Sequence, residues 1–322
     1  MDKKSNKSIN NNEEIKENIK TKRETVTNTD VKPIIVDTEK RERENKLLSP
    51  KLDVIFQILF GEVGSEKITK SFLEAILDKE IKEVDLKENI VLRRENLEEK
   101  MGVLDVLAKI NNEEYCNVEM QMVEKSQLLK RMLYYWSRVY TRNIKEGKDY
   151  IELKKTIEVL IVNFEIKGLK DLGYHSKWKI IEEKYRKHIL TEDLEIHIIV
   201  LPRIRKLAPK ESKEELVKWL NFIEEPESEK VVQYMKENEG IKEAKEKLEV
   251  MSEDKRIQKL AELREKAIMD EKAIERFGRE EGIEIGKKTE KEQTAKKMKE
   301  KGLDIELIKE ITNLTEEEIK LL

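Results

Sequence analysis

Acidic residues interrupt two apolar runs within residues 102–121, whose sequence is GVLDVLAKINNEEYCNVEMQ. Asp105 lies in the first run and Glu119 in the second, and a polar Asn-Asn-Glu-Glu tract separates the runs. A strand core ordinarily has apolar residues at such positions, because a buried ionised group is costly unless it has a partner. The pattern therefore indicates that the two carboxylates share a ligand of opposite charge.

A hairpin register brings these two acids together. If residues 111–113 form the loop, opposed residues have numbers that sum to 224, and Asp105 is then opposite Glu119. Side chains alternate between the two faces of a strand, so Gln121 points to the same side as Glu119. A loop of even length would place the two acids on opposite faces and destroy the cluster.

Such a cluster is suited to Mg²⁺, with Mn²⁺ as the alternative ion. Two close carboxylates repel each other, and a divalent cation removes the conflict. Mg²⁺ takes oxygen ligands, typically one or two carboxylates together with waters and a substrate phosphate. The backbone carbonyl of Met120 can supply another ligand, and the Gln121 amide can orient a water that the metal activates. This chemistry predicts phosphodiester hydrolysis.

The elements around the hairpin follow from apolar spacing. Helices are expected at residues 52–59, at 65–77 with Ser65 as N-cap, and at 127–144. Strands are expected at residues 89–92, 103–110, 114–122, 156–164 and 194–201. The run 156–164 is β-branched almost throughout, which is typical of a strand covered on both faces. This order predicts an α/β fold with a mixed sheet.

The chain after residue 206 is expected to be entirely helical. Polar helical patterns cover residues 212–223, 229–237 and 241–277, and Gly278, Gly282 and Gly286 are expected to interrupt them. Gly302 marks a further break. Thr315 and Glu318 have the spacing of a capping box at the start of a short final helix.

Composition limits the classes of function. The 322 residues include 66 Lys and Arg against 69 Asp and Glu, so nucleic-acid binding would need a local basic patch. Cys116 is the single cysteine, which excludes an intramolecular disulfide. No apolar run approaches the roughly 20 residues that span a bilayer, and the polar N-terminus lacks a signal-peptide pattern. We therefore expect a cytoplasmic protein with no membrane partner.

The hairpin and its neighbours resemble the PD-(D/E)XK nuclease superfamily, and within it the Rpn family of recombination-promoting nucleases, also labelled transposases. The matching pieces, in chain order, are SPKLDVIFQILFG, SFLEAIL, GVLDVLAKINNEEYCNVEMQ, KRMLYYWSRVY and LEIHIIVLPRI. The C-terminal segment beginning EEGIEIGKKTEKEQTAKKM is also similar to the tail of many such proteins. The resemblance depends on the order of these pieces and on the Asp…Glu-x-Gln core.

The resemblance implies that Asp105 and Glu119 are metal ligands and that Gln121 stands where the superfamily usually has lysine. A neutral amide cannot stabilise negative charge as an ammonium does. Lys125, Lys130 or Arg131 could supply the missing cation. Two further positions compare with the family pattern: Asp53 matches an acidic residue, and Gln57 replaces the lysine that follows the Phe of the first helix.

The chain is expected to have four segments. Residues 1–46 are rich in Lys, Asn, Glu and Thr and are expected to be disordered. The resemblance, which covers roughly residue 47 to the end, implies that residues 47–206 form a PD-(D/E)XK nuclease-like core with a mixed sheet flanked by helices. Residues 207–290 are expected to form a helical extension, and residues 291–322 a small module similar to a helix-turn-helix.

The helix after the hairpin carries candidate DNA contacts. Lys125, Lys130, Arg131 and Tyr134 are expected to contact phosphates. The alternative is that the aromatic residues of this helix pack in the core with Trp136 and Tyr140. His175, His188 and His197 lack metal-ligand spacing, and His197 is expected to be structural.

These observations predict a metal-dependent DNA endonuclease linked to recombination or mobile elements. One alternative is a catalytically weak or inactive nuclease fold that binds nucleic acid or a protein partner. Another is a structural protein that self-associates through its C-terminal helices. Simpler interpretations of the motif also stay open: the two acids could face solvent, and Gln121 could be an ordinary polar strand residue.

Overall fold

The structure is a computed structural model that describes residues 46–86, 91–92, 102–142, 144, 147–207 and 214–322. The chain divides into two units, Met1–Lys46 and Leu47–Leu322. The expected disorder of residues 1–46 lies outside the described residues, except for Lys46. All helices and strands given below belong to the second unit.

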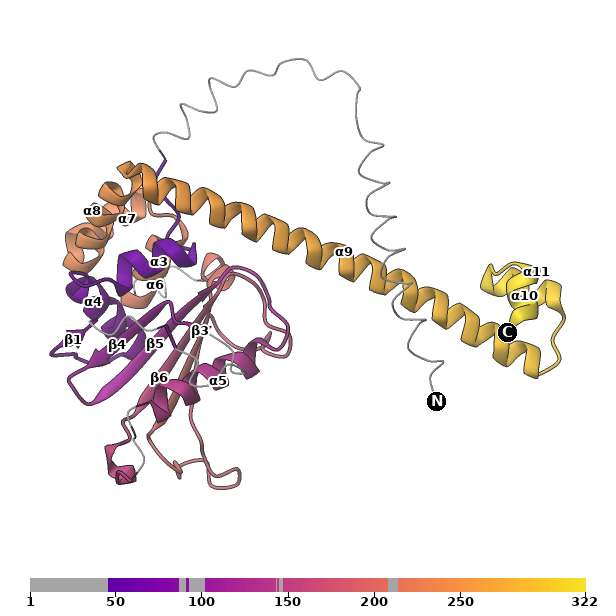
Figure 1. Cartoon of the computed structure of the whole chain (residues 1–322), viewed down its shortest axis with the longest axis horizontal. Helices are drawn as coiled ribbons and strands as arrows, with labels where there is room; N and C mark the ends of the chain where they lie inside the picture. Colours follow the sequence, from indigo (N-terminus) through magenta and orange to yellow (C-terminus); the bar gives the residue numbers. More distant parts are fainter. Residues whose placement is uncertain (1–45, 87–90, 93–101, 143, 145–146, 208–213) are drawn as a thin grey trace, which may run out of the picture. The chain divides into compact units, whose positions relative to one another are not determined.

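A mixed sheet of six strands forms the centre of this unit (Figure 1). Its order is β1 (Val84–Asp85), β4 (Val106–Ile110), β5 (Glu114–Gln121), β6 (Thr156–Val162), β8 (Leu194–Val200) and β7 (His175–Trp178). β4 and β5 form an antiparallel hairpin, whereas β5, β6 and β8 run parallel to one another. The short strands β2 (Val91–Leu92) and β3 (Gly102–Val103) form a separate antiparallel pair. The expected α/β class with a mixed sheet is confirmed.

The middle strands have the composition that burial on both faces requires. Every residue of β6 is buried, as the β-branched run predicts. A parallel pair needs a long crossover, and α5 (Leu128–Thr141) lies in the connection from β5 to β6. β1 and β7, which the apolar pattern did not predict, occupy the two edges of the sheet.

Helices pack on one face of the sheet, and the larger hydrophobic core lies between them and the sheet. This core joins α3 (Asp53–Gly61), α4 (Glu66–Leu77), α6 (Glu215–Glu224) and α8 (Glu239–Glu253) to the sheet. The rings of Phe56, Phe60, Phe72 and Trp219 pack against one another inside it. Side chains from Leu52 to Ile268 share this single core, so segments on both sides of residue 206 pack together.

The opposite face carries α5. Leu128 and Met132 of this helix pack on Leu160 of β6 and on side chains of β8. Val139 and Tyr135 pack on Leu107 and neighbouring residues at the β4 side. Trp136 donates its Nε1–H to the Thr156 carbonyl at 2.9 Å, which ties α5 to the start of β6. α5 thereby covers the face toward which Glu119 points.

The remaining helices complete the C-terminal part of the chain. They are α7 (Glu229–Glu237), α9 (Lys255–Glu300), α10 (Ile305–Thr312) and α11 (Glu316–Leu321), besides the short 3₁₀ helices Tyr150–Glu152 and Leu201–Lys206. The capping box of Thr315 and Glu318 is confirmed, and Gly302 has a positive φ of 73° as expected for a helix break. None of the helices in the described part of the chain has the length and apolar character needed to cross a bilayer.

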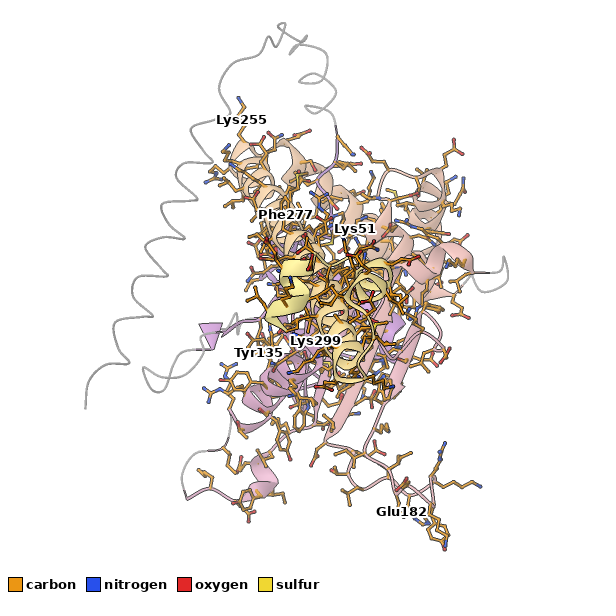
Figure 2. All side chains as sticks on the ribbon, turned by 90° about the vertical axis from the view of Figure 1, so that its right-hand side faces the viewer. Lys51, Tyr135, Glu182, Lys255, Phe277 and Lys299 are labelled. Atoms are coloured by element: carbon orange, nitrogen blue, oxygen red, sulfur yellow. The ribbon has the colours of Figure 1, made fainter. Side chains whose placement is uncertain are left out.

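The expected interruption of the helix at Gly278, Gly282 and Gly286 is wrong. α9 continues through all three glycines for 46 residues, and the chain breaks instead at Asp254, between α8 and α9. A glycine inside an exposed helix costs only about 1 kcal/mol relative to alanine, which a long helix can absorb. Apolar side chains along this stretch are exposed, among them Phe277, which Figure 2 labels among the described side chains.

Candidate active site

The hairpin has the predicted register. Val106 pairs with Val118 and Ile110 pairs with Glu114, so opposed residues have numbers that sum to 224, and residues 111–113 form the turn. The expected strand over residues 103–110 is shorter, however. β4 begins at Val106, and Asp105 lies in a bend immediately before it.

Asp105 is held at this bend by the neighbouring strand. Its Oδ2 accepts a hydrogen bond of 2.8 Å from the backbone N–H of Met120, the residue after Glu119. The N–H and C=O of one strand residue point to the same side of the strand, so the Met120 carbonyl also points toward β4. The side chain of Asp105 and this carbonyl are therefore close to each other at the end of the hairpin.

Burial raises the pKa of Asp105 to about 8. The hydrogen bond from Met120 lowers the pKa, the charges of Glu119 and Asp53 raise it, and the charge of Arg264 lowers it. Two acids and one cation, from three separate parts of the chain, thus influence the pKa of this carboxyl group electrostatically.

Helix α3 presses directly on the backbone of Asp105. A Cβ atom built on Gly61, the last residue of α3, would lie 3.0 Å from the Asp105 carbonyl oxygen and 3.3 Å from Cγ2 of Val106. Glycine is therefore the residue that permits this close approach. This close contact restricts the bend at Asp105, immediately before β4 begins.

Glu119 is buried on the sheet face that α5 covers, with 5% of its surface exposed. Burial raises its pKa, and a hydrogen bond from Asn117 and the charges of Arg131 and Lys125 oppose the rise. Gln121 is half-buried at the end of β5 and shares the side of Glu119, because the residues of a strand alternate.

Two further polar residues of the site, Asn117 and Glu158, were not predicted. Asn117 on β5 is opposite Glu158 on β6, and its Nδ2 donates to Glu158 Oε1 at 2.9 Å. The same Nδ2 lies 3.5 Å from Oε1 of Glu119. Asn117 has the same parity as Glu119, and Glu158 is the one charged residue in the run TIEVLIV; these were the available signals.

Glu158 is completely buried. Its pKa is raised well above the usual value by burial and by the charges of Glu119 and Asp105. Asn117 Oδ1 and Glu158 Oε2 are buried atoms without a hydrogen-bond partner within the described residues. Two buried polar atoms of the site thus have no hydrogen-bond partner among the described residues.

The candidate DNA contacts on and before α5 divide into two groups. Lys125 and Arg131 are half-buried and act electrostatically on Glu119. Lys130 and Tyr134 are exposed. Tyr135 is half-buried, with its ring 5.6 Å from the guanidinium carbon of Arg131.

A salt bridge from the distant helix α9 reaches the edge of the site. Arg264 Nε lies 2.7 Å from Oδ1 and 2.8 Å from Oδ2 of Asp53, the first residue of α3. These two residues are 211 positions apart in the sequence. Asp53, to which the sequence pattern assigned no role, thus lies within electrostatic reach of Asp105.

Comparison with known protein families gives one match. A model of the PD-(D/E)XK nuclease family transposases matches residues 50–276 of the chain. The chain belongs to this family. Searches of curated proteins and of solved structures found no match. The matched region of the PD-(D/E)XK transposase begins before Asp53 and ends after Arg264, so it includes all the site residues described above.

PD-(D/E)XK nucleases generally use divalent metal ions, and the donor set of this family member fits such an ion. Asp105, Glu119 and the Met120 carbonyl are oxygen donors, which hard cations prefer. The raised pKa values of Asp105 and Glu119 show that their ionised forms lack sufficient compensating positive charge, which a bound cation would supply. Among the described residues, no three His, Cys, Asp or Glu side chains are arranged to hold an ion by themselves. The protein's ligands would therefore be completed by water and a substrate phosphate.

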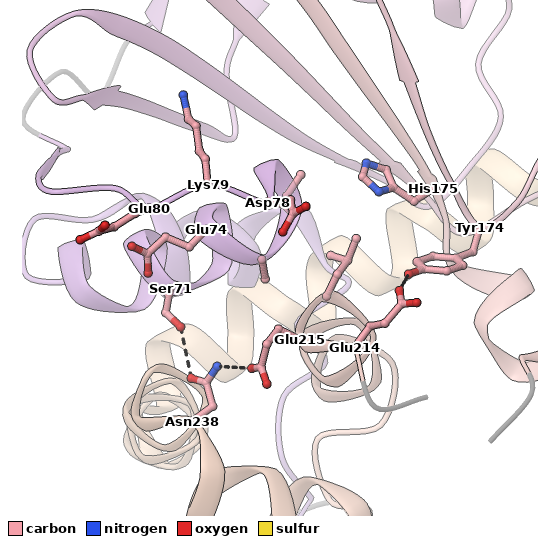
Figure 3. Close-up of a pocket in the computed structure, with 13 residues that line it drawn as sticks. Ser71, Glu74, Asp78, Lys79, Glu80, Tyr174, His175, Glu214, Glu215 and Asn238 are labelled. Carbon is pink, nitrogen blue, oxygen red and sulfur yellow. Dashed lines mark hydrogen bonds between the residues drawn. The ribbon is translucent and has the colours of Figure 1, made fainter. Parts of the chain in front are cut away.

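A pocket of the PD-(D/E)XK transposase lies apart from these acids. A hollow of about 880 Å³ is lined by residues of α4, the start of α6, Asn238, and Tyr174 and His175 (Figure 3). His175 and His197 are joined at 2.8 Å, and His197 Nε2 donates to Glu195 Oε1 at 2.9 Å. His197 is buried within β8, which supports its expected structural role.

Proposed function

We propose that this chain is a metal-dependent DNA endonuclease that hydrolyses phosphodiester bonds during recombination or the movement of mobile elements. The proposal depends chiefly on one observation: the carboxylate of half-buried Asp105 accepts the Met120 N–H, next to buried Glu119, and burial raises the pKa of both acids. Family membership supports the same chemistry.

Asp105, Glu119 and the Met120 carbonyl would hold Mg²⁺, or Mn²⁺ as the alternative. When bound, such an ion polarises a phosphoryl oxygen and lowers the pKa of a coordinated water. Asn117 restrains the Glu119 carboxylate through its Nδ2, which keeps that ligand oriented. The Gln121 amide, on the same side of β5, can position the attacking water.

The basic residues on and just before α5 would bind the DNA backbone. Lys125 and Arg131 lie close enough to Glu119 to lower its pKa, so they can also contact the phosphate that is cleaved. Lys130 and Tyr134 are exposed and suited to neighbouring phosphates.

Cleavage of supercoiled plasmid DNA tests this proposal. The wild-type protein should convert the plasmid with Mg²⁺ or Mn²⁺ and should be inactive with EDTA. Asp105→Ala and Glu119→Ala should each reduce the rate by about a hundredfold or more. Glu114→Ala is a matched control on the same hairpin, since Glu114 pairs with Lys79 at the other end of β5. Unchanged cleavage in both site variants would overturn the proposal.

A second candidate is a nuclease fold that binds nucleic acid without efficient cleavage. The neutral Gln121 favours this candidate, because an amide cannot stabilise developing negative charge as a lysine can. It predicts DNA binding that persists in EDTA and a plasmid that stays intact with either metal.

A further inference from the structure

The cations near the candidate metal ligands are unevenly distributed. Lys125 and Arg131 act on Glu119, whereas the cation that acts on Asp105 is Arg264. Gln57 of α3 and Gln121 of β5 are neutral, and both elements contact Asp105, α3 through Gly61 and β5 through the Met120 amide. Hydrolysis of a phosphodiester adds negative charge to a site that already contains buried acids, so a fixed cation on the Asp105 side would stabilise the transition state.

Packing and hydrogen bonds fix the position of Arg264. Ala261 and Ile268 lie on the same face of α9, three residues before and four residues after it, and both are buried in the main core. Its Nε contacts both carboxylate oxygens of Asp53, and Asp53 Oδ1 also accepts the Val54 N–H at 2.9 Å. Its side chain is 23% exposed. The guanidinium is thus a preorganised group that solvent still reaches.

One edge of the guanidinium remains available. Nη1 lies 3.4 Å from Glu271 Oε1, which is a long hydrogen bond. Nη2 has no hydrogen-bond partner within the described ranges. Guanidinium groups match the oxygens of a phosphate because their N–H donors form a planar fork.

We propose that Arg264 of α9 is a substrate-binding cation of the active site. Its guanidinium would contact the phosphate undergoing cleavage, on the side of Asp105. This inference rests on the proposed nuclease function and adds a residue to it. Asp53 holds the guanidinium in place through Nε, which leaves Nη2 for an oxygen of the substrate. The first turns of α9 would then belong to the catalytic apparatus.

The competing explanation is that Arg264 only ties α9 to α3 through Asp53. The two explanations differ when the salt bridge is already broken. In an Asp53→Asn background, loss of the Arg264 charge should have little further effect if the salt bridge is its sole task. A substrate-binding cation should still be needed there.

The experiment uses the full-length protein and compares wild type, Asp53→Asn, Arg264→Gln, the double variant and Arg264→Lys. Arg256→Gln is the matched control, because Arg256 lies on the same helix, is exposed and pairs with Asp254 away from the site. The readouts are kcat and KM for a defined DNA duplex with Mg²⁺, together with the Tm of each variant.

Arg264→Gln should lower kcat by about tenfold to a hundredfold both alone and in the Asp53→Asn background. Arg264→Lys should recover part of this loss, and Arg256→Gln should match wild type. A change of less than about twofold between Asp53→Asn and the double variant would overturn the inference. Wild-type activity in the same assay tests the underlying nuclease function separately, since its absence would refute that function whatever Arg264 does.

Discussion

Asn117 and Glu158 lie directly opposite each other on the parallel strands β5 and β6 and share a hydrogen bond of 2.9 Å. The same Asn117 amide reaches Glu119, so a deeply buried acid is linked to a candidate metal ligand through one side chain. This arrangement places two acids with raised pKa values side by side and makes the stability of the protein depend on pH.

Replacing Glu158 by Gln should reduce that dependence. The folded-state pKa of Glu158 is raised by burial and by its acidic neighbours, so its contribution to stability is present at acidic pH and is lost as the pH rises. Glu158→Gln removes the ionisable group, and the variant should be more stable than wild type at pH 8 by about 1–3 kcal/mol. Urea denaturation between pH 5 and pH 8 measures this. Glu124→Gln, an exposed control, should follow wild type; a parallel curve for Glu158→Gln would contradict the argument.

Asp105 should make the metal-free protein sensitive to alkaline pH. Its pKa rises from 3.8 to about 8 on folding, so stability is lost progressively as the pH increases from about 4 to about 8. Asp105→Asn should show a smaller loss over this range. Mg²⁺ at millimolar concentration should raise the Tm of wild type at pH 8 but leave Asp105→Asn almost unchanged. Equal Tm shifts in both proteins would place the ion elsewhere.

Gly61→Ala should disturb the bend that carries Asp105. The added Cβ would meet the Asp105 carbonyl oxygen at 3.0 Å, and relief of this contact requires α3 or the bend to move. We expect a loss of about 1–3 kcal/mol in the free energy of unfolding, together with slower DNA cleavage.

Gly278→Ala is the control for Gly61→Ala. A Cβ at Gly278 meets nothing within 4 Å on the exposed surface of α9. The substitution should stabilise the protein by up to about 1 kcal/mol through helix propensity and leave cleavage unchanged. Equal effects of the two substitutions in thermal unfolding would refute the role of the close approach.

Gln121→Lys should increase the rate of cleavage. Gln121 is half-buried on the side of Glu119, where an ammonium group would stabilise negative charge on the phosphate. We expect a several-fold rise in single-turnover rate with Mg²⁺ and no loss of Tm, because acidic neighbours favour the added cation. A rate as low as that of Asp105→Ala would show that the amide itself is required.

His175 should weaken the fold in mild acid. Burial lowers its pKa to about 4, and the nearby His197 and Lys177 act in the same direction. Its contribution to stability is therefore present above its ordinary pKa of 6.5 and is lost as the pH falls toward 4. His175→Gln should lose less stability between pH 7 and pH 4 than wild type. His188→Gln, at an exposed histidine, should behave as wild type in the same titration by circular dichroism.

Local patterns in the sequence were sufficient for much of the fold. The positions of α3, α4, β5, β6 and β8, the register of the hairpin and the capping box of the last helix follow from alternation, helical spacing and turn chemistry, which act over a few residues. The pairing of Asp105 with the strand of Glu119 was predictable for the same reason, since a hairpin joins neighbours in the chain.

The rest of the site was decided by tertiary structure. Glu158 looks like an isolated polar residue until β6 pairs with β5 in a parallel register, and the edge strands β1 and β7 form only because the sheet offers them partners. Asp53 and Arg264 meet across 211 residues because the core face of α9 packs on α3. Contacts between segments so far apart depend on how whole elements bury their apolar faces together, which short-range spacing does not encode.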